Sequence, residues 1–161
     1  MKEIFEAQKK WRNAKVLAGS ICLQRGDQEM ARKLSECHMF KGTESLSEMI
    51  DLMFSAQGSE FLTTFGFPDL ATFRKFIKYQ PERLGVFIDK GEIALSQEKN
   101  IFVVGNTTAR IKCSETALYR IMLMHGASAV IEASGYSVVS VKSDDESEVS
   151  IIESDNCKIL K

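Results

Sequence analysis

The stretch IMLMHGASAVIEASGYSVVSV, residues 121–141, is built mostly from small and β-branched side chains. Within it, Ile121, Ile131 and Val141 recur at intervals of ten residues. Around each of them, small and apolar side chains follow at a spacing of two, and residues two apart share one face of a strand. The stretch therefore predicts consecutive short strands, each with a β-branched residue at the centre of its buried face.

The same ten-residue pattern extends beyond this stretch. A small residue stands four positions before the central residue of each strand and once more near the end of the chain: Thr107, Ala117, Ala127, Ser137, Ser147 and Cys157. Short turn segments separate the strands: SET, MHG, SGY, DDE and SDN. Small inward residues favour two thin, closely packed sheets over a wide barrel interior.

A ten-residue period fits two architectures, an antiparallel meander or sandwich and a solenoid with two strands in each coil of about 20 residues. Alternate turns resemble each other, because Ser114, Ser134 and Ser154 open them at intervals of 20 residues. Residues 20 apart stack in neighbouring coils of such a solenoid, whereas a meander gives alternate turns no reason to match. We therefore expect a short β-solenoid of about three and a half coils, with the meander as the alternative.

Two details of the stacking follow from the solenoid. Lys112 and Glu132 should lie side by side on the outside of adjacent parallel strands, where opposite charges are favourable. Ile93 stands 18 residues before Ile111 and, like Ile111, three residues before a serine. We therefore expect Ile93 to stack on Ile111 and to begin this column of the core.

Residues 1–80 follow a helical pattern instead. Apolar residues recur at spacings of three and four along a long first helix: Ile4, Ala7, Trp11, Ala14, Ala18 and Ile21. Gly26 predicts the end of this helix, and Asp27 predicts an N-cap for the next one. Ser45 followed by Glu48 is a capping-box pattern and predicts a further helix start.

The change of period marks a change of domain. Pro81 falls where the helical pattern ends, so we expect an α+β chain with a helical domain over 1–80 and a β-solenoid domain over 81–161. Six phenylalanines at helical spacing should fill the helical core: Phe54, Phe61, Phe65, Phe67, Phe73 and Phe76.

Composition restricts the classes of function. The 161 residues carry a net charge of −1, which argues against general binding to nucleic acid or to anionic membranes. No secretory signal and no apolar run long enough for a membrane span is present, so we expect a cytoplasmic protein with reduced cysteines. Cys22, Cys37 and His38 lack a second close pair of ligands, and we expect neither a metal nor a cofactor.

The segments GNTTARI and HGASAVIEASG, with the Ala/Val/Ser runs around them, resemble short β-solenoid repeats of uncharacterised bacterial and phage-borne proteins over residues 100–155. The resemblance implies a scaffold or contact surface and carries no activity. No nucleophile elbow, zinc-protease motif, phosphate loop or dinucleotide fingerprint occurs in the chain. The function we expect is a non-enzymatic protein–protein interaction or assembly module with an unknown partner or with itself.

Two alternatives stay open. The strand half resembles in outline the left-handed β-helix acyltransferases, which implies a histidine base; His125 in the MHG turn is the candidate, with Asp145 stacked near it. Those enzymes have coils of three six-residue repeats, a phase that this chain does not keep. A weak single-stranded nucleic-acid binder is the second alternative, with basic and aromatic candidates in one segment: Arg74, Lys75, Lys78 and Arg83 with Phe76 and Tyr79.

One apolar feature stands out on the predicted outer surface. Outward positions should be polar, yet Leu118 and Met122 face outward, Val138 stacks on Leu118, and Met124 lies just beyond. Such a patch is covered either by the helical half of the chain or by a partner. We predict Leu118, Met122, Met124 and Val138 as partner-binding residues and assign no catalytic residue.

Overall fold

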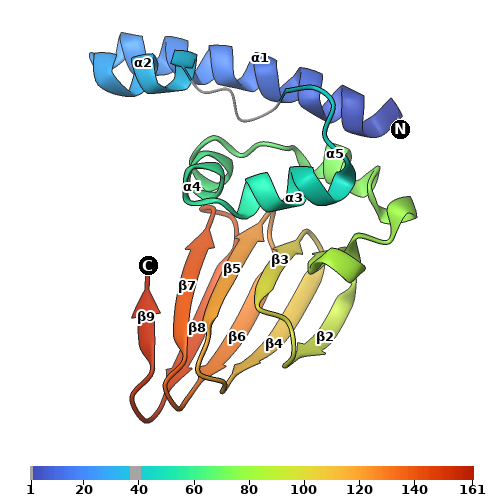
Figure 1. Cartoon of the computed structure of the whole chain (residues 1–161), viewed down its shortest axis with the longest axis vertical. Coiled ribbons are helices and arrows are strands. Elements are labelled where there is room, and N and C mark those ends of the chain that lie inside the picture. Colours follow the sequence, from blue (N-terminus) through green and yellow to red (C-terminus); the bar gives the residue numbers. More distant parts are fainter. Residues whose placement is uncertain (1, 37–40) are drawn as a thin grey trace. The chain divides into compact units, whose positions relative to one another are not determined.

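Figure 1 shows the computed structural model of the chain, in which residues 2–36 and 41–161 are described. Cys37 and His38 therefore lie outside the described residues. The chain divides into two compact units, Met1–Pro68 and Asp69–Lys161. The sequence predicted the boundary at Pro81. Residues 69–80 contain helical segments, as predicted, but they belong to the same compact unit as the strands.

The described part of the first unit contains four helices. They are α1 (Lys2–Gln24), α2 (Gln28–Glu36), α3 (Leu46–Phe54) and α4 (Ala56–Phe65). The predicted stripe on α1 is buried at Ile4, Trp11 and Ala18. Gly26 follows α1 with a φ of 79°, and the Asp27 carboxylate accepts the Met30 backbone N–H at 3.0 Å. Both predicted helix boundaries are therefore confirmed.

The start of α3 and the aromatic core also follow the prediction. The Ser45 hydroxyl accepts the Glu48 backbone N–H while the Glu48 carboxylate accepts the Ser45 N–H, a complete capping box. Trp11 packs edge-on against Phe61 and Phe67, with ring centroids 4.2 and 5.4 Å away. Such aromatic pairs add to the free energy gained by burying the rings.

The second unit begins with short helical segments and continues as strands. The helical segments are α5 (Leu70–Arg74), η1 (Ile77–Tyr79) and η2 (Pro81–Leu84). The strands are β1 (Val86–Ile88), β2 (Gly91–Leu95), β3 (Asn100–Val104), β4 (Thr107–Cys113), β5 (Leu118–Met124), β6 (Ser128–Ala133), β7 (Val138–Ser143), β8 (Glu148–Glu153) and β9 (Lys158–Leu160).

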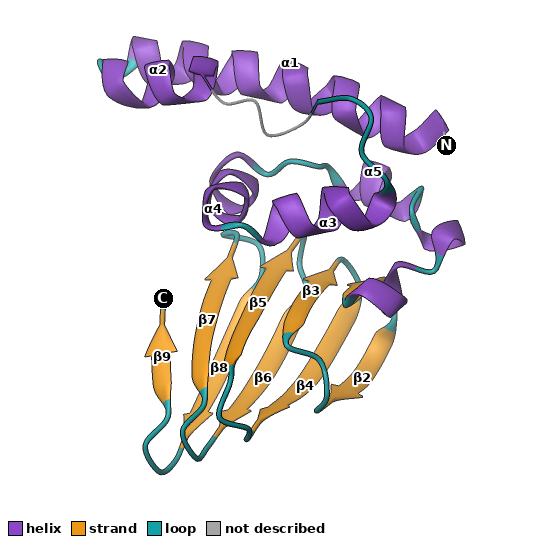
Figure 2. Cartoon of the chain, viewed as in Figure 1, coloured by secondary structure: helices purple, strands orange, loops and turns teal. Residues whose placement is uncertain are grey.

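The strands alternate between two parallel sheets (Figure 2), in the orders β1-β3-β5-β7-β9 and β2-β4-β6-β8. Ile121 pairs with Ile101 on one side and with Val141 on the other, a shift of 20 residues at each step. Every pairing is parallel. The β-solenoid with coils of about 20 residues is therefore confirmed, and the meander alternative is wrong because it requires antiparallel pairs.

The first coil is shorter than the sequence spacing suggested. Leu95 pairs with Ile111, and Ile93 pairs with Ala109, so the shift is 16 residues. The prediction that Ile93 stacks on Ile111 is wrong. Strands β2 and β3 have five residues each, whereas β4 and β5 have seven, and shorter strands close a shorter coil.

The core between the sheets consists of the inward residues at a spacing of two. Ile111, Tyr119 and Ile131 are completely buried. The inward residues of the last coil, Ile151 and Ile159, are only partly buried. Burial of apolar area, the main source of stability, is therefore greatest in the middle coils.

Candidate functional site

The four predicted partner-binding residues lie on the outer face of the sheet that contains β5 and β7. Leu118 pairs with Val138 as predicted. Met122 and Met124 lie at the opposite end of β5, and between them and Leu118 the outward residue is Arg120, which pairs with Ser140. The four residues therefore do not form one continuous apolar patch.

Met122 and Met124 belong to a grid of outward apolar residues that is buried. Paired across three strands, the grid consists of Val86, Phe102 and Met122 in one row and Ile88, Val104 and Met124 in the next. Met122 is 2% exposed and Met124 is completely buried. Phe73 of α5 packs edge-on against Phe102, with ring centroids 5.2 Å apart. A helical segment of the same unit thus covers part of the grid, and a partner cannot reach the two methionines without displacing packing atoms.

Leu118 and Val138 are more accessible. Leu118 is 39% exposed, and Val138 is half-buried. Their row continues to Lys158 of β9, and the neighbouring row runs from Arg120 through Ser140 to Leu160. The accessible part of the predicted surface therefore borders the edge strand β9.

His125 lies in the turn between β5 and β6, where its φ of 59° is in the left-handed region. The turn of the next coil stacks on it. The His125 backbone N–H donates to Asp144 at 2.7 Å, and its Nδ1 lies 3.9 Å from the Glu146 carboxylate. Asp145, the predicted neighbour, is exposed, and the carboxylates on either side of it face the histidine. The 20-residue period correctly predicted which turn stacks on His125, but not which residues of that turn lie beside it.

The Asp144 contact is one of three similar contacts between neighbouring coils. The Asp89 carboxylate accepts the Asn106 N–H at 2.8 Å, and the Asp155 carboxylate accepts the Gly135 N–H at 3.1 Å. Each turn aspartate satisfies a backbone donor that the strand ladder leaves unpaired. These aspartates therefore have a structural role in the stacking of the turns.

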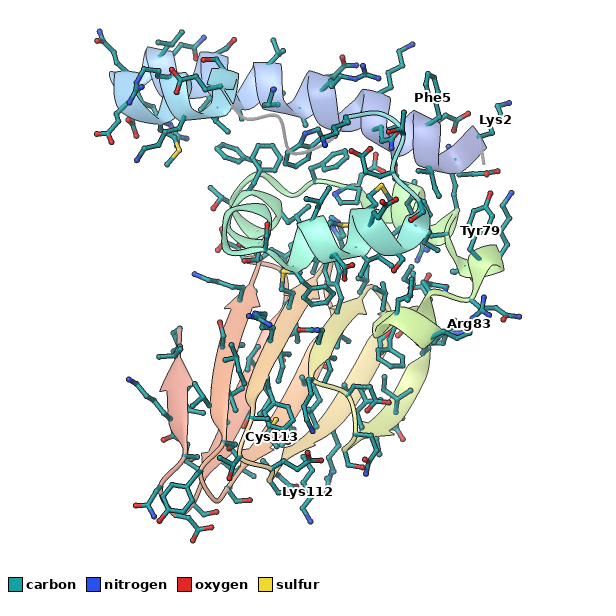
Figure 3. All side chains as sticks on the ribbon, viewed as in Figure 1. Lys2, Phe5, Tyr79, Arg83, Lys112 and Cys113 are labelled. Carbon is teal, nitrogen blue, oxygen red and sulfur yellow. The ribbon has the colours of Figure 1, made fainter. Side chains whose placement is uncertain are left out.

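The side chains suggested for nucleic-acid binding are largely engaged within the second unit. Arg74 Nε donates to Asp89 at 2.6 Å, and Glu82 pairs with Lys90 in the same region. Phe76 is 3% exposed, so its ring presents no face to a nucleobase. Arg83, a further basic candidate, donates a hydrogen bond to the Tyr79 carbonyl at 3.4 Å; both residues are labelled in Figure 3.

Cys113 is buried in the core between the sheets (Figure 3), and burial raises the pKa of its thiol to about 11, with a small opposing effect from Lys99. A thiol with this pKa is almost entirely protonated at neutral pH and is a poor nucleophile or metal ligand. The described cysteines Cys22, Cys113 and Cys157 are all free.

The last coil exposes apolar side chains that the sequence interpretation missed. Ile152 of β8 is 56% exposed, and Leu160 of β9 is 41% exposed. The outward neighbour of Ile152 in the preceding coil is Glu132. One sequence signal could have revealed Ile152: it is an apolar residue at an outward position whose equivalents in the preceding coils are charged.

Comparisons of the chain with protein-family models, with curated proteins and with solved structures found no match. Within the described residues, no helix combines the length and the apolar character needed to cross a membrane.

Proposed function

We propose that the chain is a non-enzymatic protein–protein interaction and assembly module that associates with a second copy of itself through the coil formed by β8 and β9. One observation carries the proposal: this coil exposes apolar residues at outward positions that are polar in the preceding coils, and its inward residues are less buried than their equivalents in the middle coils. Ile152 and Leu160 are exposed on its outer face, and inward Ile151 and Ile159 are only partly buried. Covering these side chains would recover free energy that the isolated chain leaves unused.

The backbone of the same coil favours association. Among the described strands, β8 and β9 are the last members of their sheets. An edge strand leaves alternate N–H and C=O groups without a strand partner. Another strand that pairs with this edge satisfies those groups and extends the sheet, which is a common mode of protein recognition.

Charge favours a second copy as the partner. Strand β8 carries Glu148 and Glu153, whereas β9 carries Lys158 and is followed by Lys161. The arrows of β8 and β9 point in opposite directions in Figure 2. A two-fold axis parallel to the strands would therefore place β8 of each copy antiparallel to β9 of the other copy. In both of these contacts, acidic residues of β8 would face the basic residues at β9. Pairing of β8 with β8 would instead bring two acidic strands together.

The predicted surface borders this edge. The row of Leu118 and Val138 ends at Lys158 of β9. A copy or another protein docked at β9 would lie beside these two residues. For the setting, we propose the cytoplasm of a bacterial or phage system, supported by the unpaired described cysteines and by the resemblance of residues 100–155 to β-solenoid repeats.

Sedimentation velocity over a concentration series tests the proposal. We expect reversible dimers in the wild type, because an edge made of two short strands is smaller than a permanent interface. Glu153→Lys and Lys158→Glu should each weaken the dimer, and the double variant should restore it, since the two symmetry-related contacts between these positions again join opposite charges. Ile152→Lys should abolish it, because an edge lysine blocks strand addition.

The matched control is Leu17→Lys, which changes an aliphatic side chain that is 63% exposed on α1 of the first unit, outside the proposed interface. It should leave the dimer unchanged. A wild type that stays monomeric at every concentration would overturn the proposal, as would a dimer that Ile152→Lys leaves intact while the protein keeps its circular dichroism spectrum.

A further inference from the structure

Three side chains with metal-binding groups converge at the rim of the solenoid. His125 comes from the turn between β5 and β6, and Asp144 and Glu146 come from the stacked turn between β7 and β8. One ligand atom from each lies within 4.8 Å of the other two. We propose that these residues form a binding site for a divalent transition-metal ion, with Zn²⁺ as the preferred occupant.

Two of the three ligands are already held in place. The His125 side chain is 13% exposed, and its ring packs edge-on against Phe73, with centroids 5.8 Å apart. Asp144 accepts the His125 backbone N–H through one carboxylate oxygen and the Ser147 hydroxyl through the other, both at 2.7 Å. Hydrogen bonds that orient a ligating carboxylate in this way raise metal affinity. Each Asp144 oxygen retains a second lone pair for a metal.

The third ligand, Glu146, has to move toward the other two before all three can coordinate one ion. Ligand atoms around a tetrahedral zinc ion with bonds of about 2.1 Å lie about 3.4 Å apart. The Glu146 side chain is 74% exposed and can rotate inward over this distance, whereas His125 and Asp144 stay in place. One imidazole and two carboxylates leave a fourth position for water.

The ligand set selects the class of ion. An imidazole nitrogen with two carboxylate oxygens suits Zn²⁺, Mn²⁺, Co²⁺ or Ni²⁺. Calcium prefers six to eight oxygen ligands, which this site does not supply. An ion bound here would join two neighbouring coils that are otherwise held at this rim by hydrogen bonds and packing, and would stabilise the folded unit by mass action.

Isothermal titration with ZnCl₂, followed by the absorption spectrum with Co²⁺, tests the site. We expect one saturable site per chain and a Co²⁺ spectrum without a thiolate charge-transfer band, because none of the three ligands is a cysteine. Glu146→Gln and His125→Asn should each weaken binding by at least about tenfold. Asparagine is chosen at position 125 because it tolerates the positive φ there.

The chain offers two matched controls. Asp145→Asn removes one negative charge next to the cluster without removing a proposed ligand. It should leave the metal affinity unchanged. His38→Ala, which removes the other histidine of the chain, should also leave it unchanged. Absence of saturable binding would overturn the proposal, as would equal losses for Asp145→Asn and Glu146→Gln, or a thiolate band that shows binding at cysteine. The Zn²⁺ titration is independent of whether the chain dimerises.

Discussion

The column formed by Ile111, Ile131 and Ile151 allows one substitution to be compared at two depths of the same core. These residues pair in register across β4, β6 and β8. Ile131 is completely buried in a middle coil, whereas Ile151 is partly buried in the last coil. Replacing each by alanine removes the same atoms from two environments, so the difference between the two results isolates the effect of burial.

The magnitude follows from the atoms removed. Isoleucine to alanine deletes three carbons, worth about 0.8 kcal/mol each when fully buried, and the cavity left between rigid sheets adds to this. We expect Ile131→Ala to lower the free energy of unfolding by about 3–4 kcal/mol. Ile151→Ala should lower it by roughly 1–2 kcal/mol, because that side chain is only partly buried and, among the described strands, its coil has a neighbour on one side.

Urea denaturation followed by far-ultraviolet circular dichroism measures both values. Trp11, the single tryptophan of the chain, lies in the first unit, so its fluorescence reports on that unit separately. Losses of equal size for Ile131→Ala and Ile151→Ala would refute the gradient of burial along the solenoid. A larger loss for Ile151→Ala would also refute it, unless dimerisation through β8 and β9 has covered that residue, which repeating the pair at low protein concentration distinguishes.

Asp89 and Cys113 give two further predictions. The Arg74 hydrogen bond, opposed by burial, lowers the pKa of Asp89, so its contribution to stability is present above the ordinary carboxyl pKa of about 3.9 and is lost as the pH falls through the lower folded value. Asp89→Asn should therefore cost about 1–2 kcal/mol in urea denaturation at pH 7, with the difference from wild type shrinking below pH 4; a difference independent of pH would contradict this. Burial raises the pKa of Cys113 to about 11, so at pH 8 only about one thiol in a thousand is ionised. Alkylation followed by mass spectrometry should label half-buried Cys157 well before Cys113, and equal labelling rates would show that the core around Cys113 opens readily.

The predicted partner surface shows where inference from alternation stops. Sequence alternation identified Leu118, Met122 and Val138 as outward residues, because the two faces of a strand differ by a single position. Whether an outward residue is exposed depends on what packs against it, and Met122 is 2% exposed whereas Leu118 is 39% exposed. The Phe73 contact with Phe102 joins residues 29 positions apart, and no local pattern reports such a contact.

The sequence by itself determined the period of the strands, the faces that they bury, the helix caps at Asp27 and Ser45, and the stacking of residues 20 apart. These features are local or repeat regularly, so the pattern of neighbouring side chains is sufficient to predict them. Only the tertiary structure decided the 16-residue first coil, the convergence of Asp144 and Glu146 on His125, and the exposed edge at β8 and β9. Each of these depends on strand length, turn geometry or the presence of a neighbouring coil, and a shift of one residue in a turn changes which side chains meet.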